Sequence, residues 1–133
     1  MSRPRKAVDD PVRKMLRERR ASSQAVRGGL EYLLRRWRDT VAEVERMTGT
    51  PPPADMDEYL NDIDARQLLQ DALAVATGDQ KARVAEEVAA LDERFRAATK
   101  PVLVSIWGAK NAAKAGWTAE RNWWYFRVPR NAE

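Results

Sequence analysis

Hydrophobic residues in the middle of the chain recur every three to four positions, which predicts amphipathic helices. Between residues 30 and 47, one helix face carries Leu30, Leu33, Leu34, Trp37, Val41, Val44 and Met47. Arginines 35, 36 and 38 lie mostly on the other face. Such a helix is about 27 Å long. We expect it to end at Gly49, because the triple proline 51–53 prevents continuation.

Two more helices are predicted downstream. The first runs from near Asp62 or Asp64 to Ala76, with inward residues Ile63, Leu68, Leu69, Ala72, Leu73 and Ala76. Gly78 and Asp79 then end one helix and start the next. The next helix has a narrow seam suited to packing on the helix at 30–47, made by Val84, Val88, Leu91, Phe95 and Ala98. We therefore predict an all-α fold, a small antiparallel bundle of three to four main helices.

The N-terminal region is predicted to lie at the periphery. Residues 1–9 form a flexible basic arm in this interpretation, and residues 10–133 form a single helical domain. Asp10 followed by Pro11 is typical of a helix start, so we expect a short basic helix at 11–20. A helix that short is marginal alone, and its order should depend on docking. Gly28 and Gly29 predict a kink or a late helix start.

The C-terminal third is harder to assign. The β-branched residues in 102–107 favour a strand, yet Pro101 before them and Gly116 after them suit a helix over 102–115, which we favour. Thr118 should cap a last turn through Trp123, and Tyr125 to Val128 should be extended, because Pro129 follows. Whether 102–107 and 124–128 instead form a small strand pair is left open.

Residues 116–129 hold three of the five tryptophans of the chain. Large aromatics bury the most apolar area, so core packing is their commonest role. Four consecutive residues, 123–126, cannot all face inward on one element. Part of this Trp-rich segment should therefore meet another segment, another chain or water. The candidate partner-binding residues are Trp117, Trp123, Trp124, Tyr125 and Arg127.

Composition narrows the chemistry. Among the 133 residues there is no cysteine and no histidine, which removes disulfides, thiol nucleophiles, the usual general base and the commonest metal ligands. We expect no enzyme, no cofactor and no metal. No apolar run approaches the roughly 18 residues of a membrane span, and no secretion signal is visible, so we expect a cytoplasmic protein without a membrane role. Heavy arginine and alanine usage suggests a bacterial origin.

An acidic run occupies Asp55, Asp57, Glu58, Asp62 and Asp64. As a calcium loop it fails, because Leu60 stands where glycine is needed and Arg66 where glutamate is needed. Helix capping and a solvated face are the commoner roles of such residues. We therefore favour capping and a solvated face over a functional site for these residues.

The net charge of +4 is unevenly distributed, with +8 in residues 1–38, −8 in 39–98 and +4 in 99–133. Segregated charge steers partners, or is satisfied within the molecule or between two copies. The basic N-terminal residues are Arg3, Arg5, Lys6, Arg13, Lys14, Arg17, Arg19 and Arg20. They could contact a phosphate backbone, although nothing here resembles a sequence-reading motif.

These observations favour a small non-enzymatic protein-binding or regulatory protein. In this hypothesis an aromatic C-terminal surface and segregated charge engage a protein partner or a second copy. The alternative is a nucleic-acid-associated protein that binds phosphate backbone non-specifically through the basic N-terminal arm.

Overall fold

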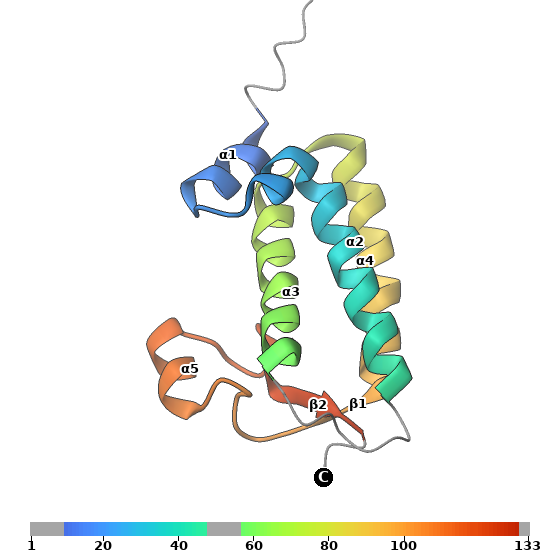
Figure 1. Cartoon of the computed structure of the whole chain (residues 1–133), viewed down its shortest axis with the longest axis vertical. Coiled ribbons are helices and arrows are strands. Elements are labelled where there is room, and N and C mark those ends of the chain that lie inside the picture. The colour runs from blue at the N-terminus through green and yellow to red at the C-terminus, as the bar shows by residue number, and fades with distance from the viewer. Residues whose placement is uncertain (1–9, 48–56, 131–133) are drawn as a thin grey trace, which may run out of the picture.

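Three long helices dominate the computed structural model, which describes residues 10–47 and 57–130 (Figure 1). α2 spans Ser23–Met47, α3 spans Asp57–Val75 and α4 spans Gly78–Ala98. α3 runs antiparallel to α2 and α4, which share one direction. The shorter elements are α1 (Pro11–Glu18), β1 (Thr99–Pro101), α5 (Ala109–Ala115), the 3₁₀-helix η2 (Trp123–Phe126) and β2 (Arg127–Pro129). The predicted all-α fold is confirmed.

The core is built from the apolar seams that the periodicity predicts. On α2, Leu30, Leu33, Leu34, Trp37, Val41 and Val44 are buried, and on α4 so are Val84, Val88, Leu91, Phe95 and Ala98. The rings of Trp37 and Phe95 join the two helices, with centroids 5.0 Å apart. The predicted packing of the α4 seam on α2 is therefore confirmed, and hydrophobic burial along it supplies the main driving force for the bundle.

Ion pairs on the surface align α2 with α4. The α2 members lie seven residues apart and alternate in sign, and their partners on α4 alternate in the opposite sense. The pairs are Glu31–Arg83, Arg38–Glu87 at 3.1 Å and Glu45–Arg94 at 2.6 Å. The hydrogen bond from Arg94 lowers the pKa of Glu45. Exposed pairs add little stability each, but sliding α4 until Arg38 faced another arginine would oppose like charges.

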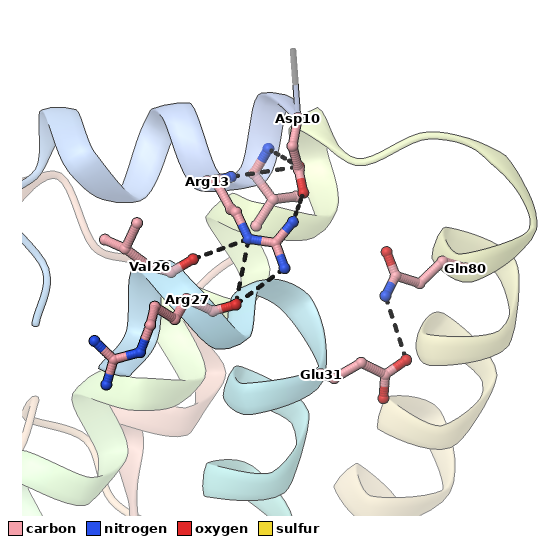
Figure 2. A network of polar contacts seen from close by, with 7 residues as sticks. Asp10, Arg13, Val26, Arg27, Glu31 and Gln80 are labelled. Atoms are coloured by element: carbon pink, nitrogen blue, oxygen red, sulfur yellow. Dashed lines mark hydrogen bonds and ion pairs between the residues drawn. The ribbon is translucent and has the colours of Figure 1, made fainter. Parts of the chain in front are cut away.

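α1 buries Val12 and Leu16 in the core, and one guanidinium bonds it to the start of α2 (Figure 2). α2 is kinked at Gly29, whose φ of 59° and ψ of −143° suit glycine almost alone. Arg13 lies against this kink and donates to the carbonyls of Val26 and Arg27, each at 3.0 Å. Its third nitrogen bonds the Asp10 carboxylate at 2.7 Å, and that carboxylate also caps α1. The expected kink is confirmed, and so is the helix start at Pro11.

The helix favoured over residues 102–115 is wrong. Residues 102–108 are a loop, and α5 occupies only Ala109–Ala115. The backbone at 102–106 bonds elsewhere: the N–H groups of Val102 and Ile106 donate to the carbonyls of Phe126 and Tyr125, at 2.9 and 2.8 Å. These long-range bonds replace the local helical ones, in line with the β-branched composition of the stretch.

A small strand pair does form, but it is displaced from the stretches considered for it: β1 lies before residues 102–107, and β2 overlaps 124–128 at residues 127 and 128. β1 pairs antiparallel with β2, with Thr99 opposite Pro129 and Pro101 opposite Arg127. The expected extension of 125–128 needs correction, because η2 covers residues 123–126 and the extended backbone starts at Arg127. In a 3₁₀ turn, successive aromatic side chains point in different directions around the axis. In a strand they would alternate between only two faces.

We predict that Arg13→Ala lowers the free energy of unfolding by about 1.5–3 kcal/mol, because it removes charge-assisted hydrogen bonds that tie α1 to α2. Urea unfolding followed by circular dichroism measures this. Lys14→Ala is the matched control: Lys14 is exposed, and its ion pair with Glu18 is 3.9 Å long. Equal stability of the two variants would contradict the role given to Arg13.

Candidate functional site

A buried ion pair lies at the centre of the bundle. Arg66 of α3 meets Asp92 of α4 in two parallel bonds, Nε to Oδ1 at 3.0 Å and Nη2 to Oδ2 at 2.8 Å. The two residues are 4% and 8% exposed. The indole of Trp37 also donates to Asp92 Oδ1 at 3.0 Å, and Arg66 Nη1 donates to Gln70 at 3.1 Å. A buried charge pair is stable only when hydrogen bonds of this kind occupy its donors and acceptors.

Tryptophans enclose the guanidinium of Arg66. Its central carbon lies 4.3 Å from the ring centroid of Trp124, and 5.8 and 5.9 Å from those of Trp37 and Trp123. Arg96 covers Trp123 at 3.9 Å. Cation–π attraction strengthens in a desolvated setting. The Trp-rich segment therefore closes the bundle over the ion pair.

The candidate partner-binding residues of this segment are largely used inside the fold. Trp124 and Tyr125 are each 1% exposed, and Trp117 and Trp123 are half-buried. Arg127 donates to the hydroxyl of Thr99 at 2.8 Å and to nearby carbonyls. A partner could reach Trp124 and Tyr125 only if the segment left the bundle, and the partner-binding role of the five stays a prediction.

Asp64 anchors the same segment from α3. Its Oδ1 accepts bonds from the Tyr125 hydroxyl at 2.7 Å and the Trp107 indole at 3.2 Å. Trp117 stacks on Tyr125, with centroids 3.9 Å apart and an interplanar angle of 21°. Burial raises the pKa of Tyr125, and the hydrogen bond to Asp64 raises it further. This aspartate thus serves the architecture of the C-terminal region.

The rest of the acidic run is only partly described by the structure. Asp62 lies 3.7 Å from Arg36, while Asp55 and the side chains of Asp57 and Glu58 fall outside what is described. Within the described residues, no group of three or more acidic side chains could hold a metal ion. Likewise, no helix in 10–47 or 57–130 combines the length and apolar character needed to cross a membrane.

The basic N-terminal residues are divided between structural and exposed positions. Arg3, Arg5 and Lys6 lie outside the described residues. Arg13 bonds the α2 kink, and Arg19 pairs with Asp71 of α3 at 2.5 Å. In the described part, the exposed cations of α1 and its C-terminal end that have no carboxylate partner are Arg17 and Arg20. Of the five members of the basic set that the structure describes, two are thus engaged by the fold, and the nucleic-acid-binding role of the set stays a prediction.

A polar groove is lined by side chains of α3, by Arg19 after α1 and by residues 115–117, 121 and 122. Its volume is about 740 Å³, and its walls include Gln67, Gln70, Asp71, Trp117, Arg121 and Asn122. A second hollow of about 480 Å³ is lined by Asp64, Trp107, Lys114 and Trp117, among others. Ala115 and Trp117 line both, so the two hollows are neighbours.

Among the large hydrophobic side chains that the structure describes, the two most exposed belong to the loop after β1. Leu103 is 99% exposed and Val104 is 54% exposed. Sequence reasoning noted the apolar stretch 102–107 but assigned it no binding role. It also missed the buried pair, although Arg66 lies three residues from both Ile63 and Leu69, at an inward position of the seam.

No family model, curated protein or solved structure matches this chain. The features open to a functional interpretation are therefore those of its own geometry: the exposed apolar loop and the polar groove around Trp117.

We predict that Asp92→Ala lowers the free energy of unfolding by about 3–5 kcal/mol, because Arg66 is left buried without a counter-charge. The double variant Arg66→Met/Asp92→Leu should lose less unfolding free energy than Asp92→Ala, since it removes both charges and keeps apolar volume. Urea unfolding measures both. Glu86→Ala, at an exposed position of α4, should stay within about 0.5 kcal/mol of the wild type. A mild effect of Asp92→Ala would refute the central role of the pair.

A second prediction concerns pH. Because the pKa of Tyr125 is raised in the folded state, an unfolded chain releases this proton near the ordinary pKa of about 10 while the folded protein keeps it. Stability gained from the protonated phenol is present below pH 10 and falls as pH rises above it. The stability of Tyr125→Phe should therefore decline less between pH 9 and 11, measured by urea unfolding at each pH. Tyr32→Phe is the control; parallel curves for Tyr125→Phe and wild type would contradict the assignment.

Proposed function

We propose that this chain is a small, non-enzymatic, cytoplasmic protein-binding protein, and that the loop at residues 102–107 is its main contact element. The observation that supports this most directly is the exposure of two adjacent apolar side chains, Leu103 and Val104. Val75, at 39%, is the one other large hydrophobic residue exposed in the described ranges. Adjacent exposed apolar groups on a folded surface are commonly covered by a partner.

The loop is held in position at both ends. The backbone bonds from Val102 and Ile106 tie it to the buried Tyr125–Phe126 backbone. Between them, Ser105 is 5% exposed and its hydroxyl accepts the N–H of Trp107 at 3.1 Å. A loop already fixed in shape loses little conformational entropy on binding. The Trp-rich segment thus supports the contact element, and its half-buried Trp117 and Trp123 would border the interface.

Nucleic-acid binding through the N-terminal arm is the less favoured alternative. Backbone binding needs several free cations along one surface. Two of the five described basic residues in the predicted set, Arg13 and Arg19, are engaged by the fold itself. Fewer cations are then left to neutralise phosphates and release the counterions of a nucleic acid. This favours the protein-binding proposal.

Site-specific photo-crosslinking tests the proposal. A photoreactive amino acid at position 103 should give discrete crosslinked products in an extract of the native cells, and at the exposed position 89 of α4 it should not. Val104→Asp should abolish the products while leaving the circular dichroism spectrum unchanged. With purified protein alone, a crosslinked dimer would identify the partner as a second copy. Identical patterns from positions 103 and 89, or no product from either, would refute the loop as the contact element.

A further inference from the structure

The two hollows around Trp117 are adjacent, because Ala115 and Trp117 line both, and together we call them the channel. The larger is lined by Gln67, Gln70 and Asp71 of α3. One face of Trp117 is stacked on Tyr125, which holds the indole in place. Volumes of about 740 and 480 Å³ exceed what one small ion would occupy.

Carboxamides line the larger groove. Asn122 donates to Gln67 at 2.8 Å, and Gln67 donates to Asp71 at 3.1 Å, so these bonds hold the 118–122 segment against α3. Gln70 uses its carbonyl oxygen to accept from Arg66, which leaves its amide N–H₂ directed to other acceptors. Carboxamides present both donors and acceptors, which is the complement of a peptide backbone.

The charges of the channel are unequally engaged. Asp71 is balanced by its ion pair with Arg19 and also accepts from Gln67, whereas Asp64 accepts from the neutral side chains of Tyr125 and Trp107 and keeps its negative charge. The Arg121 side chain donates to the Gly116 carbonyl at 3.1 Å, and in the part of the chain described neither it nor Lys114 lies against a carboxylate. With Arg19, Arg121 and Lys114 set against Asp71 and Asp64, the lining carries a net charge of +1, and Arg121 supplies the unbalanced cation of the larger groove, which favours an acidic group there.

The mixed lining argues against a nucleic-acid strand. Single-stranded nucleic acids are bound by continuous positive grooves with aromatic faces open for stacking. Here two carboxylates stand among the cations, and one face of Trp117 is already covered by Tyr125. Phosphates every few ångströms would meet those carboxylates, whereas a peptide can place an acidic side chain at a cation and neutral groups elsewhere.

We propose that the channel around Trp117 binds an extended, acidic peptide segment of the protein partner. Gln70 and its neighbouring amides bond the peptide backbone, and Arg121 and Lys114 pair with acidic side chains. This inference rests on the proposed protein-binding function and adds the chemistry of the partner. Trp107 links the two surfaces, because it follows the apolar loop and also lines the smaller hollow.

An array of capped octapeptides tests the channel directly. Each peptide is made in two versions, with two glutamates or with two glutamines at the same positions. The full-length protein should bind a subset of the glutamate peptides at least about tenfold more tightly than the glutamine versions, measured by fluorescence polarisation after labelling. A tenfold change corresponds to about 1.4 kcal/mol, a common size for a charge contact at an interface.

Charge reversal in the channel supplies the matched variants. Arg121→Glu and Lys114→Glu should each weaken the best glutamate peptide about tenfold, and Arg121→Lys should restore most of the affinity. Lys81→Glu, at an exposed position of α4, makes the same charge change away from the channel and should leave affinity within twofold. Equal binding of both peptide versions, or equal losses from Lys81→Glu, would overturn the proposal.

Three further outcomes distinguish a nucleic-acid ligand, a failure of this inference and a failure of the proposed function. Tighter binding of labelled oligothymidylate than of any peptide, lost in Arg121→Glu, would overturn the peptide assignment in favour of a nucleic-acid strand. Absence of peptide binding while position 103 still crosslinks a protein would overturn the channel and leave the loop as the contact element. Peptide binding without any crosslink from position 103 would refute the loop instead.

Discussion

The pairing of Arg66 with Asp92 is the interaction on which the rest of the structure depends. A guanidinium and a carboxylate in a core are tolerable only if their hydrogen-bonding groups are satisfied and water is excluded. Here α2 contributes the Trp37 indole, α3 the arginine and α4 the aspartate. The C-terminal segment then covers the guanidinium with Trp124. One network therefore requires all four parts of the chain to be in place together.

This requirement explains the position of the Trp-rich segment. Trp124 is 1% exposed and its indole N–H is the one buried side-chain donor in the described residues that lacks a hydrogen-bond partner. Its contribution is a large apolar face against Arg66, which combines area burial with cation–π attraction. Drawing this segment inward leaves the preceding loop on the outside, because residues 102 and 106 both bond to residues 125–126 and the chain between them projects.

Two kinds of polar contact thus have different roles. The exposed pairs between α2 and α4 are individually weak, but their alternating signs specify register. The contacts of Asp64 and Gln67 attach the C-terminal region to α3 and shape the channel around Trp117. The proposed binding surfaces are consequences of how the C-terminal third is attached to the bundle.

The extent to which sequence predicts this protein follows from the range of the interactions. The seams at 30–44 and 84–98, the Asp10–Pro11 helix start and the Gly29 kink depend on neighbours within a turn or two, and sequence determined them correctly. The fate of residues 102–107 depended on carbonyls about twenty residues away, so local propensity chose the wrong element. The tertiary structure alone decided that Arg66 is buried against Asp92, because a charge can be buried only where folding brings its counter-charge. It alone also decided that Leu103 is left exposed, because the backbone bonds that project the loop form only after residues 102–106 have met residues 125–126.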